Sequence, residues 1–143
     1  MRNLTEMLKQ KNLKVTPQRL AIYAALYHTQ KHPSAEMIYR QLEDDYPTMS
    51  LATVYKTLDA LKKVDLIQEL NIAEDSFRYD ARTEPHVHLV CRHCHCVLDG
   101  DELSFYRMLE EEMENTHDFV VENTQIYCFG VCKACRERQE AGA

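Results

Sequence analysis

All six cysteines of this 143-residue chain fall in its last 53 residues, and four of them form two C-x-x-C pairs. Each pair places two thiolates on one tight turn, and two such pairs complete a tetrahedron around Zn²⁺. A redox role suits a single pair better than two, and secreted disulfide scaffolds are usually smaller. The sequence therefore predicts a structural Zn²⁺ held by the cysteines of both pairs, Cys91, Cys94, Cys132 and Cys135.

The two other cysteines, Cys96 and Cys128, lie outside this pattern. We interpret both as small buried apolar residues with no assigned role. A closed four-thiolate site has no open position for a substrate, so the predicted zinc stabilises the fold and does not catalyse a reaction.

A second group of candidate ligands offers only nitrogen and oxygen. His86 and His88 are two residues apart in an alternating segment, which puts both imidazoles on one face of a strand with Cα atoms about 7 Å apart. Both rings can then reach one ion, although such pairs also occur without metal. Asp80 and Asp99 flank the pair in the sequence, and His32 precedes a helix, where a surface or helix-start role is the alternative to ligation.

The first half of the chain must position His32 and Asp80, and it is mainly helical. Four segments carry apolar residues at helical spacing, three of them directly after a Thr or Ser that suits the N-cap: residues 4–13, 17–27, 35–45 and 51–61. After residue 63 the period changes to two, with a turn at 73–75, which indicates a hairpin. Helices followed by a hairpin predict a winged-helix DNA-binding domain over residues 1–80, and a generic small α+β domain is the alternative.

The second half carries the cysteines and the His-x-His pair. A polar connector at 81–85 is interpreted as a hinge. Beyond it we expect three strands and two helices, namely strands at 86–91, 119–122 and 125–131, an acidic amphipathic helix at 104–116 and a short helix at 133–140. Such a layer buries little by itself, so we expect the domain over 86–143 to complete its core by forming a homodimer. The predicted fold class is α+β: an N-terminal winged-helix domain and a small C-terminal α/β dimerisation domain.

The formal net charge of −6 argues against nucleic-acid binding when it is taken alone. The signs are segregated, however: residues 1–63 hold ten Lys and Arg against six Asp and Glu, and the remainder holds seven against seventeen. The basic half is the one that contains the predicted DNA-binding helices. No apolar run approaches the length of a signal segment or a membrane span, so we expect a cytoplasmic protein without a membrane partner.

Taken in order, five segments make the chain resemble the ferric uptake regulator (Fur) family of bacterial metal-dependent repressors, and within it the peroxide-sensing PerR branch. They are VTPQR (15–19), HPSA (32–35), SLATVYK (50–56), HVHLVCRHC (86–94) and GVCKAC (130–135). The resemblance covers nearly the whole chain. It implies a homodimer in the bacterial cytoplasm that binds a palindromic double-stranded DNA operator. It also implies that the protein is no enzyme and has no small-molecule substrate other than peroxide as a signal.

By this resemblance the regulatory site consists of His32, Asp80, His86, His88 and Asp99 and binds Fe²⁺ or Mn²⁺. Aspartate at both carboxylate positions is similar to the peroxide sensors, because iron-sensing relatives usually carry Glu at one or both. Imidazoles with carboxylates suit Fe²⁺ or Mn²⁺, whereas a Zn²⁺ or Cu⁺ sensor would recruit thiolate. The family's behaviour implies that metal holds the hinge in the DNA-binding geometry. It also implies that peroxide oxidises His32 or His86 in the iron form, which releases first the metal and then the DNA.

The resemblance also implies which residues contact DNA. Tyr55 would meet base edges and Lys56 a phosphate, with further contacts from Thr53, Arg19 and Lys14. The alternative for Tyr55 is a half-buried packing role.

Three departures from the family pattern are visible. Asp65 stands where relatives commonly place Gly. Cys96 replaces a lysine-like position, which leaves a contribution of its thiol open. Relatives with a further metal site tend to have His-His-Asp-His where this chain has PHVH at 85–88, and His where it has Thr124, so we expect that site to be absent.

Other functions remain alternatives to the peroxide-sensing repressor. The nearest is an iron- or manganese-responsive uptake regulator of the same family without peroxide sensing. A zinc deaminase would need a glutamate base in an H-x-E motif, and HVH at 86–88 supplies none. A purely structural zinc-ribbon adaptor would leave the basic helical half unexplained.

Overall fold

A computed structural model describes residues 3–73, 76–84, 86–100 and 105–142. The chain divides into two compact units, Met1–Thr83 and Glu84–Ala143, and each is considered separately. Part of the predicted turn (74–75), Pro85 of the predicted hinge and Ser104 of the predicted acidic helix lie outside the described residues. Within these ranges, no helix combines the length and apolar character needed to span a bilayer.

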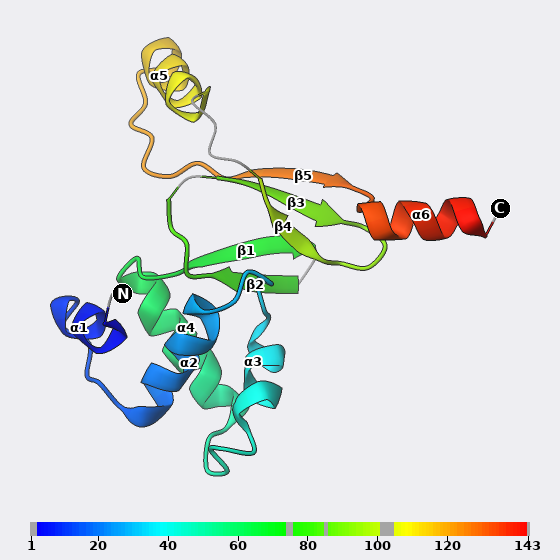
Figure 1. Ribbon diagram of the computed structural model, residues 1–143. Helices are drawn as coiled ribbons and strands as arrows, with labels where there is room; N and C mark the ends of the chain where they lie inside the picture. The colour runs from blue at the N-terminus through cyan, green and yellow to red at the C-terminus, as the bar shows by residue number, and fades with distance from the viewer. Residues whose placement is uncertain (1–2, 74–75, 85, 101–104, 143) are drawn as a thin grey trace. The chain divides into compact units, whose positions relative to one another are not determined.

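Four helices open the first unit (Figure 1): α1 (Leu4–Gln10), α2 (Pro17–Tyr27), α3 (Ala35–Leu42) and α4 (Leu51–Lys63). The predicted N-caps Thr16 and Ser50 and the predicted helix start at Ser34 are confirmed. The Thr16 hydroxyl accepts from a backbone N–H at 3.1 Å, and those of Ser34 and Ser50 do so at 3.2 and 3.1 Å. Each satisfies one of the backbone donors that a helix leaves without an intrahelical partner at its start.

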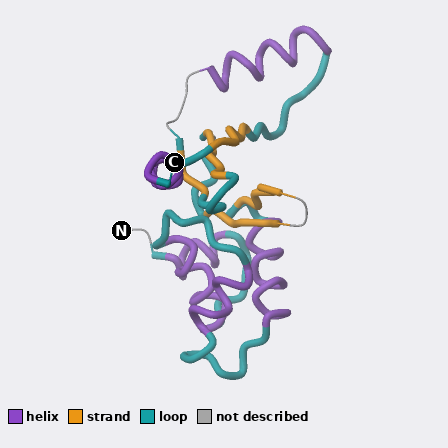
Figure 2. The backbone as a smooth tube through the Cα atoms, turned by 90° about the vertical axis from the view of Figure 1, so that its right-hand side faces the viewer, coloured by secondary structure: helices purple, strands orange, loops and turns teal. Residues whose placement is uncertain are grey.

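The predicted hairpin follows α4. Strands β1 (Gln68–Ala73) and β2 (Ser76–Asp80) pair antiparallel, with Glu69 opposite Tyr79. Figure 2 shows these two strands beside the helices. Tyr79 joins the apolar core that the helices form, which includes Ile22, Ile38 and Leu58. Helices closed by a small hairpin confirm the predicted winged-helix arrangement.

The end of α4 explains the departure at Asp65. The Asp65 N–H donates to the Lys62 carbonyl and the Leu66 N–H to the Leu61 carbonyl, both at 3.1 Å. This is the Schellman pattern, in which the residue after the C-cap adopts the left-handed conformation that favours glycine. Asp65 adopts it, with φ of 61°.

The second unit is a three-stranded sheet with two helices. The strand order is β4 (Val97–Asp99), β3 (Val87–Cys91), β5 (Ile126–Gly130); β3 pairs antiparallel with β4 and parallel with β5. Helix α5 (Phe105–His117) lies between β4 and β5 in the sequence, and α6 (Lys133–Ala141) follows β5.

One predicted strand of this unit is wrong. Residues 119–122 form no strand, and the side chains of Phe119 and Val120 are 63% and 78% exposed. The third strand of the sheet is instead β4. Strand β4 has only three residues, which are too few to show a period-two pattern. The run Phe-Val-Val at 119–121 has strand propensity but no pairing partner in the described part of the unit.

Candidate metal centres

The first C-x-x-C pair lies on the turn between β3 and β4. The Cys91 N–H donates to the Cys96 carbonyl, and the His95 N–H donates to the Cys91 carbonyl, both at 3.0 Å. His95 has a φ of 63°, which reverses the chain tightly. Cys94 therefore lies on the turn between Cys91 and Cys96, whose backbones are hydrogen-bonded to each other.

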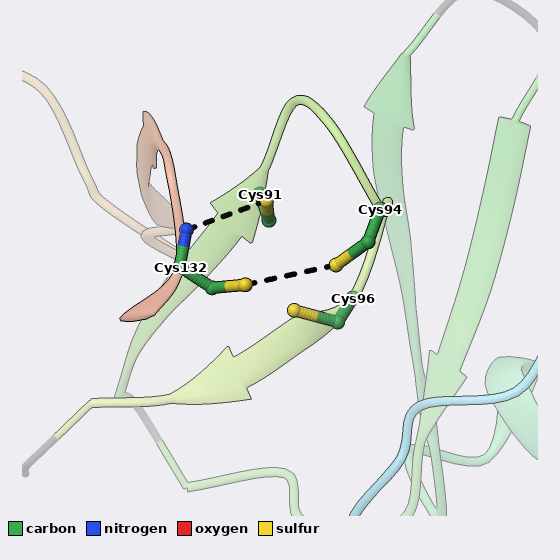
Figure 3. Close-up of side chains that lie close together, drawn as sticks. All are labelled: Cys91, Cys94, Cys96 and Cys132. Carbon is green, nitrogen blue, oxygen red and sulfur yellow. Dashed lines mark hydrogen bonds between the residues drawn. The ribbon is translucent and has the colours of Figure 1, made fainter. Parts of the chain in front are cut away.

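The second pair starts at the N-terminus of α6. Cys132 is the N-cap residue of α6, but its side chain makes no capping hydrogen bond. Its N–H donates to the Cys91 Sγ at 3.4 Å, and its own Sγ lies 3.8 Å from that of Cys94 (Figure 3). The sulfurs of Cys91, Cys94, Cys96 and Cys132 all lie within 4.8 Å of one another.

Three of these four thiols belong to the predicted zinc set, and Cys96 was missed. The signal in the sequence that includes Cys96 is the C-x-x-C-x-C spacing at residues 91–96. The fourth predicted ligand, Cys135, is buried in α6 and also interacts with the thiols of Cys132, Cys94 and Cys91. The expectation that Cys128 is buried is wrong, because its side chain is exposed on β5.

Backbone donors lower the pKa of two of these thiols, and burial raises the pKa of two others. The Cys132 N–H is the main cause that lowers the pKa of Cys91 to about 5, and the Cys96 N–H lowers the pKa of Cys94. Burial raises the pKa of Cys96 and of Cys135 to about 12. Since Zn²⁺ binds thiolates and displaces their protons, a cluster of thiols in which backbone donors favour the thiolate at two positions fits this ion. The predicted structural zinc site of the four-cysteine type is confirmed.

His32 and Asp80 meet within the first unit. His32 precedes α3 and Asp80 ends β2, and His32 Nε2 lies 3.2 Å from Asp80 Oδ2. Each is held by a further contact: Arg78 donates to the His32 carbonyl at 2.8 Å, and the Arg82 N–H donates to Asp80 Oδ1 at 2.9 Å. His32 has a φ of 52°, in the left-handed region that costs a non-glycine residue about 1 kcal/mol or more. Such strain is typical of functional positions.

His86, His88 and Asp99 meet within the second unit. His88 and Asp99 are cross-strand partners on β3 and β4. Asp99 Oδ1 lies 2.8 Å from His86 Nε2 and 3.6 Å from His88 Nε2, and both imidazoles are 2% exposed. The structure therefore brings the predicted ligands of each unit together as neighbours.

The orientation of His86 suits a metal ligand. Its Nδ1 lies 2.7 Å from the Glu84 carbonyl oxygen, which can only accept a hydrogen bond, so Nδ1 carries the proton. In the neutral ring Nε2 then presents a lone pair toward Asp99. A lone pair facing a carboxylate is stabilised by a cation between them, and a ring held by a carbonyl at its other nitrogen is the usual arrangement of a metal-bound histidine. Imidazole nitrogen with carboxylate oxygen fits Fe²⁺ or Mn²⁺.

Tyr55 of the predicted DNA-contacting residues is partly exposed. It lies on α4, is 44% exposed, and donates its hydroxyl to Glu36 of α3 at 2.5 Å. The contact lowers the pKa of Glu36 and raises that of Tyr55. The neighbouring Lys56 is exposed.

The other predicted DNA contacts take part in local structure. Thr53 Oγ1 lies 3.0 Å from the Ser50 hydroxyl at the start of α4. Arg19 donates to the Lys14 carbonyl at 2.7 Å, so the structure brings these two residues together, and the Lys14 side chain is exposed.

Comparison with known proteins identifies the family to which the chain belongs. Residues 10–129 match the family described as the ferric uptake regulator family. Among curated proteins, the chain is similar to the peroxide-responsive repressor PerR of Staphylococcus aureus, with 33% identity over 131 residues, which are 92% of this chain and 88% of that protein.

Solved structures give the same result. The Campylobacter jejuni peroxide stress regulator is 34% identical with a TM-score of 0.71, and the match covers 94% of this chain and all of that one. The Helicobacter pylori ferric uptake regulator Fur is 25% identical with a TM-score of 0.75, over 93% of this chain and 89% of that one. These likenesses confirm the predicted α+β fold class.

Proposed function

Because the chain belongs to the ferric uptake regulator family, we propose that this metal-dependent transcriptional regulator, which is not an enzyme, represses its operators until hydrogen peroxide inactivates it. Two observations support the finer assignment. Relatives named for peroxide sensing are 33% and 34% identical to the chain. Positions 80 and 99 both hold aspartate rather than glutamate, which the family resemblance implies for a peroxide sensor.

The proposed regulatory site takes ligands from both units. His32 and Asp80 offer one nitrogen and one oxygen, and His86, His88 and Asp99 offer two nitrogens and one oxygen. Together the two groups supply three nitrogens and two oxygens, a donor set that suits Fe²⁺ or Mn²⁺. One ion shared by the five residues accounts for why each group is assembled and buried.

We propose that this sharing controls DNA binding. The segment 81–85 joins the two ligand groups as a hinge, so ligands on both sides of it stay together when they share an ion. Differential affinity for that arrangement shifts the population toward it. In the proposed active form, α4 of each protomer enters the major groove at successive half-sites of a palindromic double-stranded operator.

A homodimer is required for two such half-sites, and the second unit offers a surface for it. Leu98, Leu89 and Cys128 stand side by side across β4, β3 and β5, and all three are exposed. Helix α5 buries only Tyr106 and leaves Leu109 and Met113 partly exposed. A second copy of the chain is the occupant we propose for these apolar surfaces, because a small sheet and helix bury too little alone.

The proposed peroxide response rests on the ligands themselves. Iron(II), when bound, supplies the redox chemistry by which one oxygen atom of hydrogen peroxide is added to an imidazole and the other leaves as water. His32 and His86 are the proposed targets. The Glu84 carbonyl fixes the His86 ring at Nδ1, so Nε2 stays directed at the ligand position. An oxidised ring is a poorer ligand, so the metal is released and no longer holds the hinge.

The convergence of His86, His88 and Asp99 carries this proposal. The test is operator binding, measured by fluorescence anisotropy, with Fe²⁺, Mn²⁺ or Zn²⁺ and with or without micromolar peroxide. We expect peroxide to release DNA from the iron form and to spare the manganese form. Mass spectrometry should find added oxygen on the peptides that contain His32 or His86. Equal binding of the iron and manganese forms after peroxide would instead identify a metal-uptake regulator.

A further inference from the structure

The zinc cluster holds one more thiol than zinc can bind. Cys91, Cys94 and Cys132 are common to two possible sets of four. Cys96 completes the set in which all sulfurs lie within 4.8 Å of one another, and Cys135 interacts with the same three thiols. Zn²⁺ in structural sites is almost always four-coordinate, so only one of the two completes the tetrahedron at a time.

We propose that the fourth ligand position of the zinc site is shared: Cys135 occupies it in the intact protein, and Cys96 replaces Cys135 when that ligand is lost.

The backbone holds Cys96 ready for this role. Its carbonyl accepts from the Cys91 N–H at 3.0 Å, which ties the start of β4 to the end of β3. In Figure 3 the Cys96 sulfur points toward those of Cys94 and Cys132 and not away into solvent. The residue thus reaches the cluster from the same turn as Cys94, without any rearrangement of α6.

A nearby cation favours Cys135 as the resident ligand. The Arg138 guanidinium, one turn further along α6, lies 3.3 Å from the Cys135 sulfur. Four thiolates around Zn²⁺ leave a net charge of −2, and a hydrogen bond from a guanidinium stabilises the thiolate that accepts it.

Because either Cys96 or Cys135 can fill the fourth position, zinc binding tolerates the loss of one of these two cysteines. Oxidation or alkylation of Cys135 would leave Cys96 to fill the fourth position. Loss of Cys91, Cys94 or Cys132 would leave only three positions filled, because Cys96 and Cys135 share the remaining one. Cys128, exposed on β5, lies outside the cluster and provides a matched control.

The first experiment measures zinc per chain and zinc affinity by competition with a chromophoric chelator. We expect Cys135→Ser and Cys96→Ser each to keep one zinc per chain, with an affinity within about tenfold of that of the intact protein and of Cys128→Ser. The double variant Cys96→Ser/Cys135→Ser and the single variant Cys94→Ser should lose at least about 100-fold, since even changes beyond the ligands cost 10–100-fold. The proposal is overturned if Cys135→Ser is as weak as the double variant, or if the double variant retains zinc.

The second experiment keeps all five thiols and does not depend on the folding of a cysteine variant. Alkylation of each cysteine is followed by mass spectrometry with and without zinc. In the intact protein zinc should protect Cys135 and leave the reactivity of Cys96 unchanged. In Arg138→Ala we expect zinc to slow alkylation of Cys96 by several-fold and to protect Cys135 less. An Arg138→Ala protein in which zinc never protects Cys96 contradicts the proposal.

Discussion

At the scale of single residues, the contacts between histidine and aspartate side chains depend on the charge that lies between them. Asp99 Oδ1 faces two imidazole nitrogens, and Asp80 Oδ2 faces a third. Each carboxylate pairs with a neutral ring only weakly, but a divalent ion lets the carboxylate and the ring bind through it together. The same residues thus form local pairs within each unit and a ligand set for the proposed regulatory ion.

The Tyr55–Glu36 hydrogen bond gives a residue-scale prediction about pH. Because the hydroxyl of Tyr55 stabilises the carboxylate, the pKa of Glu36 lies below its ordinary value of 4.5. A carboxyl group whose pKa is lowered by folding contributes stability above its unfolded pKa, and this contribution is lost as the pH falls through the folded pKa. Carbon NMR titration of Glu36 should therefore give a midpoint below 4.5, and Tyr55→Phe should raise it. A midpoint unchanged by Tyr55→Phe would show that the contact is absent in solution.

The spacing of the cysteines predicts four zinc ligands and does not include Cys96, for a physical reason. The motif C-x-x-C is recognised by spacing, but whether a third cysteine two residues later enters the cluster depends on the turn. Here the Cys91–Cys96 backbone hydrogen bond and the left-handed His95 direct the Cys96 side chain inward. Neither feature has a sequence signature of its own.

At the scale of elements, predictions succeeded where a cap or a long period marked the helix and failed where pairing decided the strand. Thr16, Ser34 and Ser50 begin their helices as predicted. In contrast, strand β4 exists because β3 offers it an edge, and residues 119–122 have no described partner to pair with. Helix capping is local and visible in the sequence, whereas strand pairing is not local.

The Schellman end of α4 supports an element-scale prediction. Asp65 is exposed and left-handed, so a residue without Cβ relieves the strain without removing a packing contact. We expect Asp65→Gly to raise the free energy of unfolding by about 1 kcal/mol. Asp65→Ala should lower it, because alanine has neither glycine's freedom nor the local hydrogen bonding of aspartate. Urea denaturation followed by circular dichroism measures both, and a Gly variant less stable than the Ala variant would refute the explanation.

At the scale of the whole molecule, the proposed homodimer predicts which surface charges are tolerated. Leu89 on β3 and Leu109 on α5 are 40% and 37% exposed and belong to the proposed interface. Leu89→Lys and Leu109→Lys should shift the protein to monomer and weaken operator binding by at least about tenfold, because a buried unpaired charge is costly. Glu114→Lys, exposed on the side of α5 opposite the apolar stripe, is the control. Sedimentation velocity distinguishes the two outcomes, and dimers that persist in both leucine variants would exclude this surface.

The last whole-molecule prediction concerns the sharing of one regulatory ion by two units. If His32 and His86 bind the same Mn²⁺, calorimetry of the zinc-containing protein gives one further ion per chain. His32→Ala and His86→Ala should each remove it and abolish operator binding. Two independent sites would instead give two ions, each lost in only one variant. The hinge supplies a second readout: moving a population from mostly open to mostly closed needs about 10⁴-fold preference for the closed form. Mn²⁺ should therefore protect the connector at 81–84 from proteolysis in the intact protein and in neither variant. Protection that survives His32→Ala would show that the second unit binds the ion without the first.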